Sequence, residues 1–184
     1  MDKMIYRGQE TYPEIQACPR NEHNLQIICP LYSGTLSELS AIMQYNYQHL
    51  VLRARCNEVS EIIHEISMVE MHHLNLLGCA IIAMGGNPKY VNPNTKSFWN
   101  ASVVCYDEEL CKALLTNLTQ ETEAHQAYMA AAAKVNNPAL AALLRRIAAD
   151  EKIHMDIFTN MINRHCRKNR CNKTQRKSGL ISFC

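Results

Sequence analysis

The chain has 184 residues, a length typical of a single domain, and its 47% content of hydrophobic residues can bury a sizeable core. Charged residues make up 20% and there are only 6 glycines and 6 prolines, which excludes collagen-like, low-complexity and wholly disordered chains. The formal net charge of +2 has two opposite parts, because seven of the 19 basic residues and none of the 17 acidic residues lie within residues 164–184. Residues 1–163 therefore hold 12 basic and 17 acidic residues, a net charge of −5.

The sequence lacks the usual marks of an exported or membrane protein. It has no run of about 18 apolar residues, which predicts that no transmembrane helix is present. Residues 1–16 have no apolar core of the kind that a secretory signal peptide needs. The 9 cysteines are odd in number and form no C-x-x-C pair, so we expect reduced packing residues rather than a disulfide framework or a thiolate zinc site. Together these features predict a cytoplasmic protein.

The N-terminal part of the chain changes character near Ser33. Residues 1–32 contain Pro13, Pro19 and Pro30 without a sustained period, which predicts an extended leader. From Ser33 onward apolar residues recur at spacings of three, four and seven, which predicts the first helix. Ser33 or Thr35 can cap its start, and Glu38 stands in the capping-box position relative to Thr35.

Three further helices follow. The second is predicted over residues 57–84, ended by the sequence Gly-Gly-Asn-Pro at 85–88, and residues 87–106 are predicted to be a loop. The third begins near Asp107 as N-cap and continues to about Val135. Asn137 and Pro138 supply an N-cap and a proline at the first position of the fourth helix, which extends to about residue 163.

The lengths of the connections constrain the topology. Short links within the first and second pairs of helices predict two antiparallel helical hairpins, and no strand period of two is evident. About 20 extended residues reach about 66–72 Å, so residues 87–106 can run the full length of the bundle. The predicted fold is all-α: a ferritin-like four-helix bundle over residues 33–163, formed by two hairpins and a long crossover.

Two short motifs place a carboxylate and an imidazole on one helix face. Glu70 and His73 form an E-x-x-H motif in the second helix, and Glu151 and His154 form another in the fourth. Positions i and i+3 lie about 60° apart on an α-helix, so each pair can bind the same metal ion. The glutamates also lie on the same helical faces as apolar neighbours, where an unpaired carboxylate would cost several kcal/mol.

The first and third helices share the pattern E-x-x-A-x-x-x-Y, from Glu38 to Tyr45 and from Glu121 to Tyr128. The chain is thus a degenerate repeat of two hairpins, which together supply four carboxylates and two histidines, the ligand set of di-iron and di-manganese carboxylate bundles. The predicted metal ligands are Glu38, Glu70, His73, Glu121, Glu151 and His154.

Plainer interpretations exist for several of these residues. Glu38 can be a helix cap, Glu121 a solvated surface acid, and Tyr45 and Tyr128 core residues with one hydrogen bond. If the two tyrosines serve the centre, they do so by hydrogen-bonding its ligands or by relaying electrons. Competing ligand candidates are Glu123 in place of Glu121, and the additional histidines His72 and His125.

With these residues, the sequence resembles the ferritin-like superfamily, in particular the rubrerythrin and bacterioferritin-related proteins, and it is also similar to manganese catalases. The resemblance covers about residues 33–163, and residues 138–158 look like the fourth helix of rubrerythrin-type domains. It implies that Glu70 and Glu151 bridge two metal ions, that Glu38 and Glu121 are terminal ligands, and that each histidine binds one ion. Full-length rubrerythrins add a rubredoxin module with paired C-x-x-C motifs, which this sequence lacks.

The resemblance implies redox chemistry at two iron ions per chain, with manganese as the alternative. The expected activity is that of a rubrerythrin-like peroxidase or ferroxidase, with H2O2, O2 or Fe2+ as substrate, an external electron donor and an oligomer of identical chains. Manganese catalase-like disproportionation of H2O2, or a non-enzymatic role in iron storage or structure, are the alternatives. The ligand types do not separate iron from manganese.

Residues 164–184 form a basic tail with seven lysines and arginines. Such a tail can attract nucleic acid or an anionic surface, or it can be a solvated, flexible terminus. The tail has no aromatic residues interleaved with its basic ones, which argues against a stacking site for nucleic acid.

Overall fold

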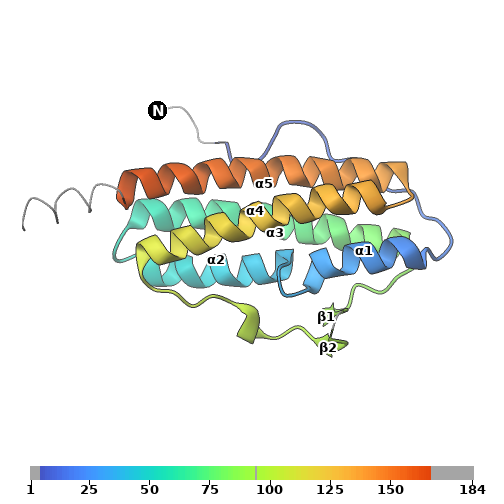
Figure 1. The fold of residues 1–184 in the computed structure, drawn as a ribbon, viewed down its shortest axis with the longest axis horizontal. Helices are drawn as coiled ribbons and strands as arrows, with labels where there is room; N and C mark the ends of the chain where they lie inside the picture. The colour runs from blue at the N-terminus through green and yellow to red at the C-terminus, as the bar shows by residue number, and fades with distance from the viewer. Residues whose placement is uncertain (1–4, 94, 167–184) are drawn as a thin grey trace, which may run out of the picture.

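The computed structural model describes residues 5–93 and 95–166. Within these ranges the chain forms a helical bundle with a small hairpin on one side (Figure 1). The α-helices are α1 (Glu22–Ser33), α2 (Glu38–Leu52), α3 (Asn57–Ala83), α4 (Leu110–Lys134) and α5 (Pro138–His165). The short elements between α3 and α4 are β1 (Val91–Asn92), β2 (Ser97–Phe98) and the 3₁₀-helix η1 (Ala101–Val103).

The predicted ferritin-like four-helix bundle is confirmed. Helices α2 and α3 form one antiparallel hairpin, α4 and α5 form the other, and residues 84–109 cross from one to the other along the bundle (Figure 1). Helix α1 continues the line of α2 toward the far end of the bundle, where it packs against α3 and α4. The first helix of the bundle is therefore made of two pieces.

The prediction of an extended leader over residues 1–32 is wrong for residues 22–32, which lie in helix α1. Asn21 caps α1, because its side chain accepts a hydrogen bond from the backbone N–H of Asn24. Leu25 and Ile28 are buried one turn apart, and this apolar face stabilises the short helix although it contains Pro30. Residues 5–20 lie along the outside of the bundle without helix or strand (Figure 1).

The break between α1 and α2 determines where Glu38 lies. Gly34 ends α1, and a Cβ atom at this residue would clash with the carbonyl oxygen of Pro30. Helix α2 is capped by Ser37, whose Oγ accepts from the N–H of Ser40, so the predicted caps at Ser33 and Thr35 are wrong. Glu38 is then the first helical residue rather than the acid of a capping box, and its side chain is buried.

The other helix ends agree with the sequence with one exception. Helix α3 ends before Gly85, whose φ of 74° is the left-handed conformation that favours glycine after a helix. Asn137 caps α5 and Pro138 is its first residue, as predicted. The predicted N-cap Asp107 is wrong: the carboxylate of Glu109 accepts hydrogen bonds from two backbone N–H groups and starts α4 instead.

The crossover also contains a strand pair that the sequence did not predict. Strands β1 and β2 pair antiparallel, with Val91 opposite Phe98, but each has only two residues, too few to show a period of two.

Within the described residues, one helix is long and apolar enough to cross a membrane by length and composition alone. This helix is α3, and 44% of its most apolar stretch is buried within the bundle. Its buried face carries Glu70 and His73, so the helix has the composition of a core helix in contact with a polar centre. The absence of a transmembrane helix stays a prediction.

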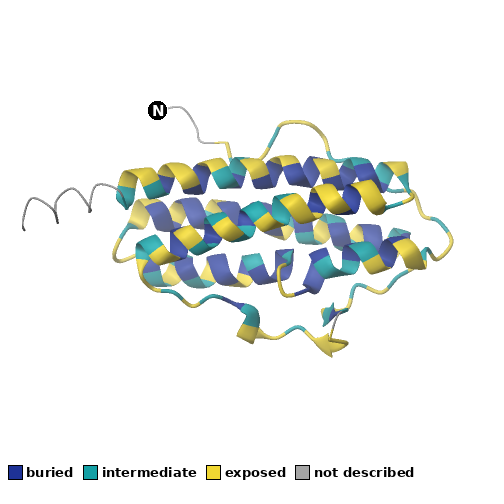
Figure 2. Ribbon diagram, in the orientation of Figure 1, coloured by how far each residue is buried: buried dark blue, intermediate teal, exposed yellow. Residues whose placement is uncertain are grey.

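Figure 2 shows buried residues along the whole length of the bundle helices. The buried apolar residues form two clusters, one toward each end of the bundle. One contains residues of α1, the end of α3 and the start of α5, and the other contains residues of α2, the start of α3 and the end of α5. Along α3, for example, Ile66 belongs to one cluster and Leu77 to the other, with Glu70 and His73 between them. Glu70 and His73 therefore lie between the two apolar clusters.

The expectation of reduced cysteines is wrong for one pair. Cys111 at the start of α4 and Cys166 after α5 form a disulfide, with their Cα atoms 5.7 Å apart. The antiparallel α4–α5 hairpin brings these two helix ends together although they are 55 residues apart in the sequence. Of the cysteines in the described ranges, Cys18, Cys29, Cys56, Cys79 and Cys105 are free thiols. The tail from residue 167 onward, with Cys171 and Cys184, lies outside the described residues, so the predictions about it do too.

Candidate metal centre

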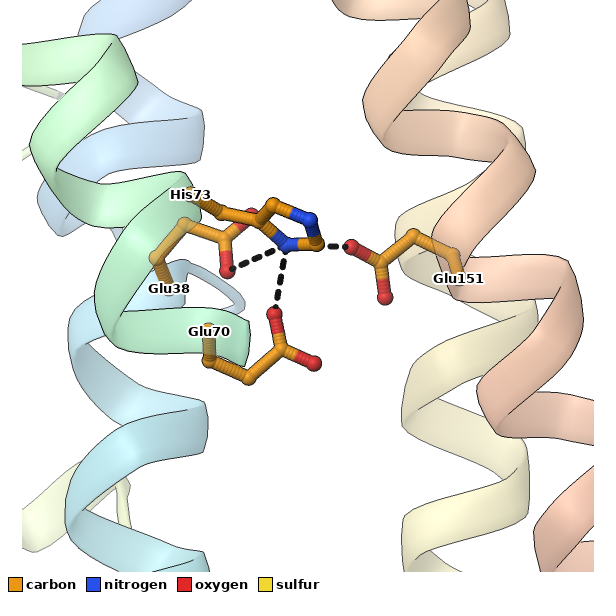
Figure 3. A group of neighbouring side chains, drawn as sticks. All are labelled: Glu38, Glu70, His73 and Glu151. Atoms are coloured by element: carbon orange, nitrogen blue, oxygen red, sulfur yellow. Dashed lines mark hydrogen bonds and ion pairs between the residues drawn. The ribbon is translucent and has the colours of Figure 1, made fainter. Parts of the chain in front are cut away.

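The structure brings all six predicted ligand residues together at the middle of the bundle. Each of four helices supplies a glutamate, and α3 and α5 each add a histidine one turn later. All six side chains are buried, the most exposed being Glu38 at 4%. Figure 3 shows four of them, with His73 above Glu70 and Glu151 facing it from the opposite hairpin. Helical periodicity produces this arrangement, because residues three positions apart share one face.

The ligand atoms form two groups of four. In the first group are Glu38, Glu70, His73 and Glu151; in the second are Glu70, Glu121, Glu151 and His154. Within each group the ligand atoms lie within 4.8 Å of one another, which suits an ion about 2 Å from each donor atom. Glu70 and Glu151 are the members that both groups share.

Glu70 lies between the two histidines. Its Oε2 is 2.8 Å from His73 Nδ1, and its Oε1 is 2.8 Å from His154 Nδ1. Glu151 approaches the same two nitrogens, at 3.3 Å from His73 and 3.5 Å from His154. Each histidine thus presents Nδ1 to the carboxylates.

The pKa values of the cluster's carboxyl groups shift in two opposite directions. Burial and repulsion from Glu70 raise the pKa of Glu38 well above its usual range, and burial and repulsion from Glu151 do the same to the pKa of Glu121. Burial opposes ionisation of Glu70 too, but the attraction of His154 and His73 outweighs it and lowers the pKa. Glu70 is therefore the carboxylate that the two histidines keep ionised.

The cluster favours the charged form of both histidines. Burial lowers the pKa of each imidazole, yet Glu70 and the other nearby carboxyl groups outweigh burial and hold the pKa values of His73 and His154 well above the usual range. Burial and Glu70 oppose ionisation of Glu151, but the nearby Glu121, His154 and His73 outweigh them and lower its pKa below the usual value. The two histidines and the two shared glutamates thus favour one another's charged forms.

Three buried ligand atoms that lack a hydrogen bond bear on whether the site suits metal ions. Glu70 Oε1, Glu151 Oε1 and His154 Nδ1 are fully buried yet form no hydrogen bond of good geometry, and only ion-pair contacts reach them. Buried polar atoms are rarely left in this way in a folded protein. Hard carboxylate oxygens and imidazole nitrogens suit divalent iron or manganese, so the donor set fits two such ions.

Tyr45 and Tyr128 hold carboxylates of the opposite hairpin. The Tyr45 hydroxyl donates to Glu121 Oε1, and the Tyr128 hydroxyl donates to Glu38 Oε1. Burial and the adjacent glutamates raise the pKa of each phenol well above its usual value, so both hydroxyls stay protonated. Each tyrosine is thus a buried core residue with one hydrogen bond, and in both cases the acceptor is a carboxyl oxygen of the cluster.

Sequence reasoning missed Asp150. This buried residue lies 3.2 Å from His73 Nε2 through its Oδ2, and its Oδ1 lies 2.7 Å from Arg146 Nη1. The hydrogen bonds of Asp150, chiefly those with His73, Arg146 and Tyr12, outweigh burial and lower its pKa. The i, i+4 pair of Arg146 and Asp150 on a core-facing stretch was the available signal.

The rubrerythrin family model matches residues 31–162, with a second match over residues 112–178. The first match spans more than half of the chain and includes all six clustered residues. The chain belongs to the rubrerythrin family.

Three solved structures are similar in fold to this rubrerythrin-family chain. It is similar to the manganese catalase KatB from Anabaena PCC7120, with a TM-score of 0.73 and 19% identity over 87% of this chain and 80% of that one. A wild-type KatB structure from Anabaena gives a TM-score of 0.75 and 20% identity over the same shares. A bacterioferritin from Rhodobacter capsulatus gives 0.69 and 19% identity over 82% of this chain and 89% of that one. At these identities the likeness is one of fold; no curated protein sequence matches.

The competing ligand candidates lie outside the cluster of this rubrerythrin-family chain. Glu123 is exposed on α4. His72 is half-buried with its ring 4.9 Å from that of Tyr12, and His125 Nδ1 lies 2.8 Å from the carbonyl oxygen of Ala148. None of the three is in either group of ligand atoms.

A narrow cavity connects the cluster with the surface between α2 and α4. Its volume is about 80 Å³, and it reaches Glu38, Glu121 and the two shared glutamates. Small side chains at Ala41, Ala124 and Ala127 line it. A passage of this size suits a molecule of a few atoms.

Proposed function

We propose that this protein is a di-metal carboxylate oxidoreductase that holds two iron ions per chain, with manganese as the alternative metal, and acts on H2O2 or O2. Oxidation of Fe2+ by the same centre is a close variant. The observation that carries the proposal is the pair of four-residue groups that share Glu70 and Glu151. Two separate metal sites would not share carboxylates.

Each residue has a role in this proposal. Glu70 and Glu151 would be shared by the two ions, Glu38 and His73 would complete the ligand set of one ion, and Glu121 and His154 would complete that of the other. Four carboxylates and two neutral histidines carry a charge of −4, which two divalent ions neutralise. The buried centre is then close to neutral, which avoids the large desolvation cost of an unbalanced charge.

Two adjacent redox-active ions can exchange two electrons with one substrate molecule. The protein supplies the surroundings for this exchange. Tyr45 and Tyr128 hold the terminal carboxylates in place and keep a proton at the hydrogen bond with each. The apolar clusters on both sides exclude bulk water, while the passage lined by Ala124 and Ala127 admits a small substrate.

Disproportionation of H2O2 is the second candidate function, and the likeness of fold to KatB favours it. This activity converts two molecules of H2O2 to two of water and one of O2, so it needs no external reductant. A peroxidase instead takes two electrons and two protons from outside for each H2O2. Iron storage is a third candidate function, because the fold is also similar to that of a bacterioferritin. We place the protein in the cytoplasm and expect it to assemble from identical chains.

Metal analysis of protein purified from its native host tests the proposal first, and two ions per chain are expected. Consumption of H2O2 by the loaded protein, with and without an added reductant, then separates peroxidase from catalase activity. A large shell-like assembly by size exclusion would favour storage. Fewer than one ion per chain would show that the di-metal proposal is wrong.

A further inference from the structure

We propose that residues 5–12, which we name the N-terminal strap, position both histidines of the metal centre from outside the bundle, with Tyr12 as the positioning side chain for His73. The inference rests on the proposed function, since it concerns how the ligands of the two ions are held. The strap reaches His73 indirectly, through Asp150, and it contacts His154 directly.

At His73 the strap acts through Asp150. The Tyr12 hydroxyl donates to Asp150 Oδ2 at 2.6 Å, and the backbone N–H of Gly8 donates to Asp150 Oδ1 at 2.7 Å. The same Oδ2 atom lies 3.2 Å from His73 Nε2. Two groups of the strap, together with Arg146 at 2.7 Å from Oδ1, therefore orient the carboxylate that faces His73.

At His154 the strap makes the contact itself. The carbonyl oxygen of Tyr6 lies 2.9 Å from His154 Nε2, and a carbonyl oxygen can only accept a hydrogen bond. Nε2 of His154 therefore carries a proton, which leaves Nδ1 as the ring nitrogen that can bind a metal ion. Tautomer and ring direction are both determined by a backbone group 148 residues away in the sequence.

Arg146 of α5 fastens the strap to the bundle. Its guanidinium group donates to the carbonyl oxygens of Glu10 at 2.9 Å and Gly8 at 2.7 Å, and it lies 4.5 Å from the centre of the Tyr12 ring. Arg146 also forms an ion pair with Asp150 at 2.7 Å. Since Arg146 is buried, these contacts hold the strap in one register on α5.

A partner that orients a metal-binding histidine typically changes metal affinity by about 10–100-fold. Tyr12→Phe removes the hydroxyl and keeps the ring, so it should weaken the ion at His73 by about 10-fold or more and leave the ion at His154 within about twofold. Tyr32→Phe is the matched control, because it also removes one hydroxyl hydrogen bond, to the carbonyl oxygen of Pro88, away from the centre.

The experiment titrates the full-length protein with Mn2+ and counts unbound Mn2+ by electron paramagnetic resonance. In the Zn2+-loaded protein, hydrogen exchange of the His73 Nε2 proton, observed with ¹⁵N-labelled histidine, should be about 10-fold faster in Tyr12→Phe than in the wild type or Tyr32→Phe. A merely structural role of Tyr12 would change neither the ratio of the two dissociation constants nor this exchange rate.

A second pair of variants tests whether Arg146 holds the strap on the bundle. Arg146→Lys should weaken both ions, whereas Arg145→Lys at the exposed neighbouring position should weaken neither; if Arg146→Lys does not fold, Tyr12→Phe decides. Two Mn2+ ions in the wild type, with equal affinities in Tyr12→Phe and Tyr32→Phe, would overturn the strap inference alone. Fewer than one Mn2+ in the wild type would overturn the proposed function, and the inference with it.

Discussion

Tyr128 of α4 donates its hydroxyl hydrogen bond to Glu38, the first residue of α2. Tyr45 of α2 makes the reciprocal contact with Glu121 of α4. The two copies of the pattern E-x-x-A-x-x-x-Y are thus joined, because the tyrosine of each hairpin donates a hydrogen bond to the glutamate of the other. A tyrosine two turns after a glutamate cannot reach it on the same helix, but it reaches the equivalent glutamate on the antiparallel partner.

Loss of either tyrosine hydroxyl should destabilise the metal-free protein by a similar amount. Tyr45→Phe and Tyr128→Phe each leave a buried carboxyl oxygen without its donor, at a cost of about 1–3 kcal/mol. Urea denaturation of metal-free protein measures this cost. Tyr106→Phe, at a residue 51% exposed, should change the free energy of unfolding by less than about 0.5 kcal/mol. A large effect from only one of the two buried variants would contradict the reciprocal arrangement.

Shared and terminal ligands should differ in how many ions their loss removes. Glu70→Ala removes a carboxylate from both groups, so metal content should fall below one ion per chain. Glu38→Ala removes a ligand from one group and should leave about one ion. Metal analysis after dialysis against weak chelator measures both, with Glu123→Ala on the surface of α4 as the control that keeps two. Equal metal content in the Glu70 and Glu38 variants would argue against bridging.

Metal binding should release protons. The cluster raises the pKa values of Glu38, Glu121, His73 and His154, which favours the protonated form of each group in the metal-free protein. Each protonated group must lose its proton to become a ligand, so the apparent metal affinity rises with pH and falls as the solution becomes acidic. Titration with Mn2+ in buffers of different ionisation enthalpy counts the protons. Metal binding without release of protons would contradict the protonation pattern.

The disulfide should contribute to stability independently of the metal. It closes a loop between residues 55 apart, for which the chain-entropy relation gives about 4 kcal/mol as the largest expected contribution, with about 2–4 kcal/mol typical. Reductant or Cys111→Ser should therefore lower the free energy of unfolding by that amount in urea. Cys105→Ser, at a free thiol of the crossover, should not reproduce the effect. Metal content should be unchanged, because both cysteines lie at the ends of the helices.

How far the sequence predicts this molecule depends on how local each signal is. The pairs Glu70–His73 and Glu151–His154 follow from helical spacing, and the repeat identifies Glu38 and Glu121. Helix α1 was missed because Pro30 and the nearby break at Gly34 interrupt its short apolar period. The contacts of Asp150 with Gly8 and Tyr12 join residues 142 and 138 positions apart, which no local pattern encodes. The Cys111–Cys166 pair likewise depends on how two helix ends meet.

The passage between α2 and α4 should limit access of substrate to the centre. Ala124 lines this cavity of about 80 Å³, and a leucine there adds a branched side chain that fills much of it. Ala124→Leu should lower kcat/KM for H2O2 by about 10-fold or more while metal content stays at two ions. Ala130→Leu, at an exposed position of the same helix, is the control for the substitution itself. Steady-state consumption of H2O2 checks both. Unchanged kcat/KM in the metal-loaded Ala124→Leu variant would show that substrate reaches the centre by another route, whereas a loss shared by both variants would point to a general effect on α4.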